Sequence, residues 1–478
     1  MAIRRPQPDE SQRWHEGISR YQWLVLLIAS LGWIFDVFEG QIFVASMREA
    51  MPSLIEPGAT EGQIARYNNI ALAAFSLGGA LGGIGFGMLS DRIGRKRTLS
   101  VTILCYSVFT CLSAFSQQWW HLVAFRFLVA LGVGGEWAVA SALVAEVFPR
   151  RARAHVGSIF HASSVLGSYL ATAAGAFLIG SAAVQAWARD SSPQWLSQIV
   201  DPASLPWRLG FALGVLPALL VVWIRTSLRE PEAWQVARER AARENAEPVG
   251  RLRELFRGDL LRRTLVGVTL ATVGLATFWS VHIYGKDLLR AAAENAASHA
   301  TAVGGELFSP TNGQALVAID PNAAKRWEML GMFLVTTGGG IGLLAFGPIS
   351  QRLGRRAAFL IFHVGGLAVS LLLFQRVQGV VPLMVTLPVF GFLTLGMHAG
   401  YAIYFPELYP TRLRGAGAGL CFNAGRVLTV PVLLTVGWLR DTQDYSLADA
   451  ASLMSALYLV GAAALIFAPE TRGQELPE

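Results

Sequence analysis

Long runs of apolar residues alternate with short polar and basic segments along almost the whole chain. The first run extends from Tyr21 to Met47, and a membrane-spanning helix needs about 20 such residues. The pattern predicts an all-α membrane protein with twelve transmembrane helices. We expect them at residues 21–47, 66–90, 98–116, 119–147, 155–181, 207–225, 264–290, 327–350, 357–376, 380–405, 415–439 and 447–468.

The composition agrees with this pattern. Of the 478 residues, 53% are hydrophobic and 15% are charged, whereas soluble domains average about 25% charged residues. The first apolar run is too long for the hydrophobic region of a cleavable signal peptide, so we predict that it is the first span. Cys105, Cys111 and Cys421 fall inside apolar runs without the spacing of metal ligands, and we expect no metal site.

Basic residues are concentrated in alternate loops. The basic loops contain Arg92, Arg95, Lys96 and Arg97, then Arg150, Arg151 and Arg153, then Arg352, Arg355 and Arg356, then Arg412 and Arg414. The intervening loop Gln117–Trp120 contains no Lys or Arg. Because cytoplasmic loops carry an excess of Lys and Arg, we predict that both termini are cytoplasmic. This placement accounts for the net charge of +7, and we expect no nucleic-acid partner.

A polar, highly charged segment at residues 226–263 separates the first six predicted helices from the last six. We predict a partly helical cytoplasmic linker there. The predicted domains are therefore residues 1–225, the linker 226–263, and residues 264–478. Two predicted outer loops, 182–206 and 291–326, are longer than the others, and we expect them to be surface elaborations.

Two loop motifs of the first half recur in the second half. Gly87-Met-Leu-Ser-Asp91-Arg92-Ile-Gly94-Arg95-Lys96 recurs from Gly347, and Glu146-Val-Phe-Pro149-Arg-Arg-Ala-Arg153 recurs from Glu407. Two independent matches at nearly the same offset indicate a duplicated unit. Its halves would be related by an axis along the membrane normal.

With these motifs, the chain resembles the major facilitator superfamily over essentially its whole length. The first loop motif matches the superfamily signature between helices 2 and 3, and the second copy departs from it at Gln351. Ser227-Leu-Arg-Glu-Pro-Glu and Pro469-Glu470-Thr471-Arg472-Gly473 are similar to segments of sugar porters and organic-acid symporters. The resemblance implies two pseudo-symmetric six-helix bundles around a cavity lined by helices 1, 4, 7 and 10. It implies a transporter and not an enzyme.

The loop motifs also have the chemistry of a gate. Gly87 and Gly94 permit a tight connection between two helices, and Arg95 and Arg153 can pair with Glu146. We favour a latch over a purely topological role, because carboxylates do not contribute to the positive-inside signal. The predicted cytoplasmic gate comprises Gly87, Asp91, Arg92, Gly94, Arg95, Glu146, Arg153, Arg352, Arg355, Glu407 and Arg414.

Ionisable residues inside predicted spans are the main functional candidates, because each costs about 2.5–3.5 kcal/mol at the centre of a membrane helix. Asp36 and Glu39 share one face of the first span, and their repulsion leads us to expect that at least one holds a proton. Arg126 lies at a depth compatible with pairing to Asp36. These three are the predicted proton-coupling residues. Glu136 either lines the same cavity or marks close packing beside neighbouring glycines.

The second half offers candidates for recognising a solute. Arg426 has no carboxylate nearby in sequence, so its anion is either a protein carboxylate or the substrate. Two pairs at i, i+3 spacing, Trp279 with His282 and His398 with Tyr401, would suit a planar or ring-bearing solute; the alternative for Trp and Tyr is the interfacial belt. The predicted substrate-binding residues are Arg426, Asn423, Trp279, His282, His398, Tyr401 and Glu136. We expect His161 and His363 to be packing residues.

The segment Asp36-Val-Phe-Glu39 resembles the helix 1 pattern Asp-Gly-x-Asp of aromatic-acid:proton symporters, with Val37 and Glu39 as departures. Arg126 and Arg426 are similar to arginines in helices 4 and 11 of that family. The resemblance implies proton-coupled symport of a small organic or aromatic carboxylate by alternating access. The alternatives are a sugar or polyol porter, a proton-coupled drug or metabolite exporter, and a non-transporting membrane receptor.

The chain has no Gly-x4-Gly-Lys-Ser/Thr motif, so ATP is not the expected energy source. We expect no cofactor. The expected partners are the small solute, protons and the lipid bilayer, and we expect a monomer. The predicted location is the cell inner (plasma) membrane.

Overall fold

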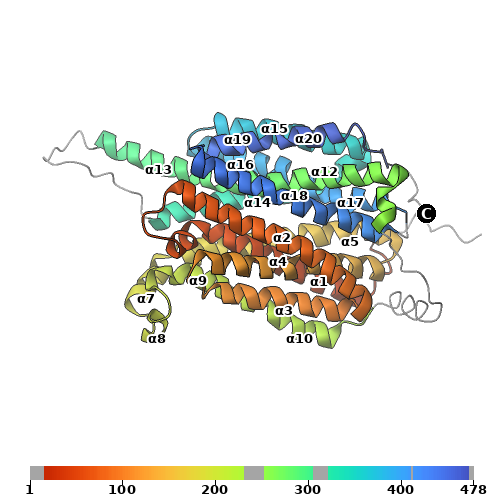
Figure 1. Ribbon diagram of the computed structural model, residues 1–478, viewed down its shortest axis with the longest axis horizontal. Helices are drawn as coiled ribbons and strands as arrows, with labels where there is room; N and C mark the ends of the chain where they lie inside the picture. The colour runs from red at the N-terminus through yellow and green to blue at the C-terminus, as the bar shows by residue number, and fades with distance from the viewer. Residues whose placement is uncertain (1–14, 231–251, 305–320, 411–412, 473–478) are drawn as a thin grey trace, which may run out of the picture.

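Figure 1 shows the fold of the protein as a computed structural model, which describes residues 15–230, 252–304, 321–410 and 413–472. Within these ranges all regular secondary structure is helical, which confirms the all-α prediction. Ten described stretches are long and apolar enough to span a membrane. They are Arg20–Ala50, Glu61–Gly87, Ile159–Ile179, Pro202–Ser227, Gly258–Ala296, Ala323–Leu353, Arg355–Gln375, Val380–Phe405, Gly417–Thr442 and Leu447–Ala464.

The two other predicted spans are also helical. α3 (Arg95–Ser113) begins with three basic residues, and α4 (Trp119–Val147) contains both Arg126 and Glu136. Among the described residues, neither is one of the ten stretches that meet the length and apolarity of a span. The structure therefore confirms a protein with many membrane helices, and the number twelve stays a prediction, as does the cytoplasmic placement of the termini.

The helices of the first 227 residues pack mainly against one another (Figure 1). They are α1 (Arg20–Ala50), α2 (Glu61–Ile93), α3, α4, α5 (Arg150–Ala162), α6 (Ser164–Ala174), α7 (Ala182–Asp190), α8 (Gln194–Ser197), α9 (Leu205–Ala212) and α10 (Pro217–Ser227). Capping boxes start the two longest: Ser19 with Gln22 begins α1, and Thr60 with Gln63 begins α2.

A second group of helices follows residue 257. It comprises α12 (Gly258–Ser280), α13 (Gly285–Gly304), α14 (Pro321–Leu353), α15 (Arg355–Gln375), α16 (Val380–Leu395), α17 (His398–Glu407), α18 (Arg414–Thr442), α19 (Leu447–Ser455) and α20 (Leu457–Ala464). The two groups meet where α2 packs on α18 and α6 packs on α14. The division of the chain at residues 225 and 263 into domains stays a prediction.

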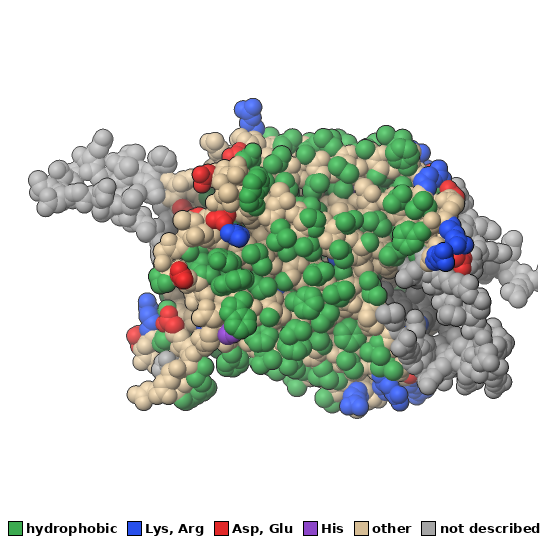
Figure 2. Space-filling model, viewed as in Figure 1, with side chains coloured by type: hydrophobic (Ala, Val, Ile, Leu, Met, Phe, Trp, Pro, Cys, Tyr) green, Lys and Arg blue, Asp and Glu red, His purple; other side chains and the backbone are tan. Residues whose placement is uncertain are grey.

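Close helix packing relies on glycine in α2. A Cβ added at Gly82 would lie 2.6 Å from Cα of Leu131 on α4, which is closer than real Cβ atoms approach other atoms. Small residues of this kind let membrane helices touch along their backbones. The outer surface is correspondingly apolar: Figure 2 shows a broad band of hydrophobic side chains with charged residues gathered at its two ends. Phe177, Val381 and Ile466, each at least 70% exposed, belong to this lipid-facing surface.

The two homologous loops turn at equivalent glycines. Gly94, between α2 and α3, has φ +106°, and Gly354, between α14 and α15, has φ +95°. These angles favour glycine, so the expectation for Gly94 is confirmed. Gly87 is different, because it lies inside α2 and a Cβ added there would meet no atom within 4 Å. The tight connection does not require glycine at that position.

A glutamate from a distant segment caps each helix that follows these loops. Glu230 accepts hydrogen bonds from the backbone N–H groups of Arg95 (2.8 Å) and Lys96 (3.2 Å) at the start of α3. Glu470 accepts the equivalent bonds from Arg355 (2.9 Å) and Arg356 (3.1 Å) at the start of α15. Partial burial would raise the pKa of Glu470, but these backbone N–H donors bring its pKa below the ordinary value. The two segments singled out by resemblance thus act as helix caps.

Three regions outside the predicted spans contain helix, and one of them is the linker, which was predicted to be partly helical. α12 begins at Gly258, inside the predicted linker, of which residues 231–251 lie outside the described residues. α13 continues to Gly304 and α14 begins at Pro321. The described residues of the predicted 291–326 loop are therefore helical, and the prediction of a loop there is wrong. The alanine-rich composition of α13 favours helix more strongly than its apolar periodicity suggested. The predicted 182–206 loop contains α7 and α8.

Candidate functional site

A cavity of about 150 Å³ lies between the two groups of helices and receives side chains from both. Aromatic side chains are the commonest kind in the lining, and its charged groups come from α1 and α18, with serine and histidine side chains from α2, α5, α6 and α17. The lining includes Trp33, Asp36, Gln41, Phe75, Trp137 and His161 from the first group, and Phe278, Trp279, His398, Tyr401, Phe422 and Arg426 from the second. A site of this composition can hold an apolar ring and orient it through a small number of charges.

Arg426 supplies a positive charge to this cavity from α18. Its guanidinium carbon lies 5.1 Å from the ring centroid of Phe422, one helical turn earlier. The carboxyl group of Asp36, on α1, attracts it from the opposite group of helices. Asp36 is only 2% exposed. The sequence left two possible anions for Arg426, and this structure places a protein carboxylate near it while leaving Arg426 at the cavity wall.

Asp36 also meets a second carboxyl group. The side chains of Asp36 and Glu136 are within hydrogen-bonding reach of each other, and Glu136 is fully buried. If both were ionised, neither oxygen of Glu136 would have a hydrogen-bond partner in the described part of the chain. Two carboxyl groups in contact are stable together when they share one proton. The Asp36–Glu136 pair can therefore hold a proton directly beside Arg426.

Arg126 and Glu39 lie elsewhere. Arg126 donates to the backbone carbonyl oxygen of Glu39 (2.8 Å) and to Ser113 Oγ (3.3 Å), and its guanidinium carbon is 4.9 Å from the centroid of Phe211. Both residues are fully buried, and neither is part of the cavity lining. The expected pairing of Arg126 with Asp36 is wrong for this structure. Glu39, most of a turn further along α1, faces α3 and α4, whereas Asp36 faces the cavity.

The predicted substrate-binding residues divide in the same way. Trp279, His398 and Tyr401 line the cavity together with Arg426. His282 does not: its Nδ1 lies 2.6 Å from Thr394 Oγ1, and its ring stacks on Phe278 at 5.0 Å. The helix breaks at Val281, where α12 ends and a short 3-10 turn begins, so the expected i, i+3 alignment of His282 with Trp279 is lost.

Asn423 is also outside the lining. Its side-chain amide donates to the carbonyl oxygen of Gly419 (3.0 Å), and its side chain fills the space that a Cβ at Gly83 of α2 would need. Asn423 therefore contributes to the contact between α18 and α2 rather than to the cavity surface. Tyr401 is anchored by a hydrogen bond from its hydroxyl to the carbonyl oxygen of Leu270 (3.0 Å), which orients its ring.

Several cavity residues were missed by the sequence reasoning. Trp33 lies three residues before Asp36, and Phe422 lies four residues before Arg426, so helical spacing from the charged residues could have found both. Trp137 stacks on Phe422 with ring centroids 4.8 Å apart, which joins the two groups of helices. His161, expected to be a packing residue, lines the cavity next to Trp33. His363 is fully buried, with Nδ1 2.7 Å from the carbonyl oxygen of Phe359.

The described part of the predicted cytoplasmic gate forms contacts within one group of helices. Arg355 binds Glu407 through two nitrogen atoms at 2.9 and 3.1 Å, and Glu407 accepts a hydrogen bond from Thr471 (2.5 Å). Arg95 Nη1 donates to Ser90 Oγ (3.3 Å), and Arg352 is exposed. The side chains of Asp91, Arg92, Glu146, Arg153 and Arg414 lie outside the described residues. A latch between the halves at this end stays a prediction.

Comparisons with known proteins agree with this architecture. A family model described as Major Facilitator Superfamily matches residues 41–420. The chain is 28% identical to a probable 4-methylmuconolactone transporter of Cupriavidus pinatubonensis, over 96% of this chain and 93% of that one. It is 26% identical to the niacin transporter NiaP of Acinetobacter baylyi, over 96% of each. The fold is similar to that of a D-xylose-proton symporter (TM-score 0.66, 17% identity, 95% of this chain and 100% of that one).

Proposed function

We propose that this chain, which belongs to the major facilitator superfamily, is a proton-coupled symporter of a small, ring-bearing organic carboxylate. It is a multi-pass membrane transporter of the cell inner membrane and not an enzyme. The observation that carries the proposal is the position of Arg426, at the wall of an aromatic cavity and beside Asp36. In this arrangement one cation faces the carboxyl group of Asp36, which can share a proton with Glu136.

Arg426 would recognise the carboxylate of the solute. A guanidinium group can bind a carboxylate through two parallel hydrogen bonds, which fixes the orientation of the bound molecule. The aromatic side chains Trp279, Tyr401 and Phe422 would then enclose its ring. A cavity of about 150 Å³ suits such a solute, because an apolar protein cavity of about that volume binds benzene. Niacin is itself a pyridine carboxylate, so one relative is named for a solute of this size and chemistry.

The same geometry suggests how the proton is coupled. When Asp36 is ionised, it competes with the solute for Arg426. When Asp36 holds the proton and donates it in a hydrogen bond to Glu136, the remaining negative charge lies on Glu136, and Arg426 is free to bind the solute carboxylate. Binding of the anion therefore favours binding of one proton, and the reverse holds by linkage. Glu39 and Arg126 would support this site indirectly, because Arg126 holds the backbone of α1 at Glu39.

Transport would follow from rocking of two six-helix halves around this cavity, which lies between them. We include in the proposal twelve spans, cytoplasmic termini and the division into residues 1–225 and 264–478. The proton and the solute would bind from the same side and be released together on the other.

The proposal is tested by uptake into proteoliposomes under an inward proton gradient. We expect uptake of labelled nicotinate that exceeds its equilibrium distribution and falls to equilibration when a protonophore is added. Uptake of D-xylose in place of nicotinate would identify a sugar porter. Proton-driven movement of an organic cation out of the vesicles would identify an exporter, and binding without any flux would indicate a receptor. Each of these three results contradicts the proposal.

A further inference from the structure

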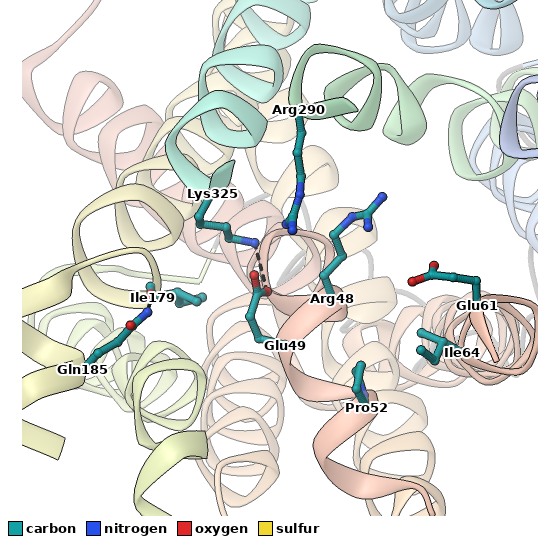
Figure 3. Close-up of a pocket in the computed structure, with 9 residues that line it drawn as sticks. All are labelled: Arg48, Glu49, Pro52, Glu61, Ile64, Ile179, Gln185, Arg290 and Lys325. Atoms are coloured by element: carbon teal, nitrogen blue, oxygen red, sulfur yellow. Dashed lines mark hydrogen bonds and ion pairs between the residues drawn. The ribbon is translucent and has the colours of Figure 1, made fainter. Parts of the chain in front are cut away.

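A second cavity, of about 280 Å³, lies at the end of the molecule where α1, α7, α13 and α14 converge (Figure 3). This end is opposite the basic loops and is the predicted outer side. Figure 3 shows Lys325 paired with Glu49 and the Arg290 side chain directed toward them, while the Arg48 side chain extends away from Glu49. None of these residues belongs to the central cavity or to the loop motifs.

Two ion pairs at this cavity join α1 to the second group of helices. Arg48 Nε lies 3.0 Å from Asp287 Oδ1 on α13, and Lys325 Nζ lies 2.9 Å from Glu49 Oε2. Lys325 also donates to the backbone carbonyl oxygen of Ala45. Opening of this end would separate α1 from α13 and α14, so both ion pairs would have to break.

Behind these pairs, one buried carboxylate is shared by three cations. Glu328 is fully buried and lies 2.5 Å from Lys286 Nζ, 3.1 Å from Lys325 Nζ and 3.3 Å from Arg290 Nη1. Lys286 also binds Asp287 at 3.1 Å. A carboxylate that is divided among three cations neutralises none of them completely.

The lining of the cavity itself contains three cations, Arg48, Arg290 and Lys325, and two carboxylates, Glu49 and Glu61. The cations of the whole cluster are Arg48, Lys286, Arg290 and Lys325, and its carboxylates are Glu49, Asp287 and Glu328. Glu61 is exposed to water, whereas Glu294 is half-buried and pairs with Arg290 Nε at 2.8 Å, which leaves Arg48 as the less fully paired of the two arginines. Arg48 uses only Nε for Asp287, and its two terminal nitrogens have no hydrogen-bond partner among the described residues.

We propose that this cavity is an outer binding site for an organic carboxylate, formed by Arg48 and Arg290. The inference deepens the proposed function, on which it rests, by adding a site that the solute meets before it reaches Arg426. An arriving carboxylate would bind the free donors of Arg48 and compete with Asp287 and Glu49 for their cations. Its binding would loosen the two ion pairs that hold this end closed, so arrival of the solute would favour opening toward it.

The test measures nicotinate binding to the full-length protein carrying Arg426→Ala, so that the central site does not contribute. Calorimetry at low salt should detect binding of nicotinate and none of nicotinamide, which has the same ring without the charge. Adding Arg48→Gln should weaken nicotinate binding about tenfold or more, because a charge-assisted hydrogen bond is lost. Arg66→Gln is the matched control: it removes the 3.1 Å pair with Asp441, which also joins the two groups, but Arg66 does not line this cavity.

Several results would overturn the proposal. These are absence of nicotinate binding in the Arg426→Ala protein, equal binding after Arg48→Gln, or an equal loss after Arg66→Gln. Arg290→Gln provides a second variant if Arg48→Gln fails to fold. The outcome is separable from the proposed function, which is judged by uptake in the wild-type protein. If the wild-type protein shows no proton-driven uptake but the Arg426→Ala protein still binds nicotinate, the symporter is rejected. If the wild-type protein shows uptake but the Arg426→Ala protein does not bind nicotinate, only the outer site is rejected.

Discussion

Replacing Asp36 by Asn tests the coupling mechanism most directly. The substitution keeps the shape of the side chain but removes its ability to ionise, in a position that is 2% exposed and next to both Glu136 and Arg426. The proton shared with Glu136 would be lost as a coupling element. We expect Asp36→Asn to bind the solute carboxylate and to equilibrate it across the membrane, but not to accumulate it against a gradient.

The magnitude follows from the number of groups involved. If one carboxyl pair takes up one proton with each solute, the dissociation constant of the wild-type protein rises about tenfold for each pH unit above the range in which the pair holds its proton. In Asp36→Asn the negative charge that competes for Arg426 is absent. The dissociation constant should then be nearly independent of pH over the same range.

The assay compares two measurements in proteoliposomes: accumulation of nicotinate under an inward proton gradient, and exchange of labelled for unlabelled nicotinate without a gradient. Exchange should persist in the variant while accumulation is lost. Asp444→Asn is a suitable control, because Asp444 is exposed and its positive φ of 52° is tolerated by asparagine. Accumulation by Asp36→Asn at the wild-type level would refute the coupling role of Asp36.

Three further predictions concern recognition and stability. Arg426→Lys should raise the KM for nicotinate uptake about tenfold, because a two-point contact becomes a point charge; an unchanged KM would remove Arg426 from the site. Gly82→Val should lower the melting temperature, at a cost of about 1–3 kcal/mol, because its Cβ would lie 2.6 Å from Cα of Leu131; Gly85→Val, where a Cβ meets no atom within 4 Å, should lower it less, and equal losses would contradict the packing argument. Glu470→Gln should cost about 1 kcal/mol at neutral pH, because the charge at the start of α15 is lost. Since the pKa of Glu470 is lowered in the folded state, its stabilisation is present above the ordinary glutamate range and disappears as the pH falls through the folded-state pKa, so the melting curves of wild type and variant should converge in acid.

The location of the helices could be predicted well because bilayer thickness imposes a length on each apolar run. The errors lie outside those runs. α13 continues beyond the predicted end at residue 290 to Gly304, through an alanine-rich segment whose polar residues resemble those of a loop. Helix propensity, rather than hydrophobicity, determines the structure there.

The sequence indicated how deep in the membrane some candidate residues lie, but not which neighbouring helix each side chain faces. Ionisable and aromatic residues inside predicted spans identified Asp36, Trp279 and Arg426, which do line one cavity, and counting residues gave Asp36 and Arg126 compatible depths. The count does not determine which neighbour a side chain faces. Arg126 therefore reaches Glu39 instead of Asp36, and the break at Val281 turns His282 away. Such details depend on contacts between helices that are far apart in sequence.

The outer charged cluster escaped the sequence reasoning for a related reason. Lys286, Asp287 and Glu328 lie near the ends of predicted spans, where isolated charges usually face water. These residues form a cluster only in the folded protein. Lys286 and Glu328 are 42 positions apart in the sequence, yet only the contact between Lys325 and Ala45 is shorter than theirs within the cluster. The packing of α13 against α14 brings them together.

The glutamate caps also have a consequence for biosynthesis. The start of α3 is held by Glu230, 135 residues further along the chain, and the start of α15 is held by Glu470, 115 residues beyond Arg355. Because a chain leaves the ribosome from its N-terminus, α3 and α15 must be inserted before the glutamate that caps their first backbone N–H groups has been synthesised. Each group of helices would then be completed only when its last segment emerges and returns to the loop between its second and third long helices.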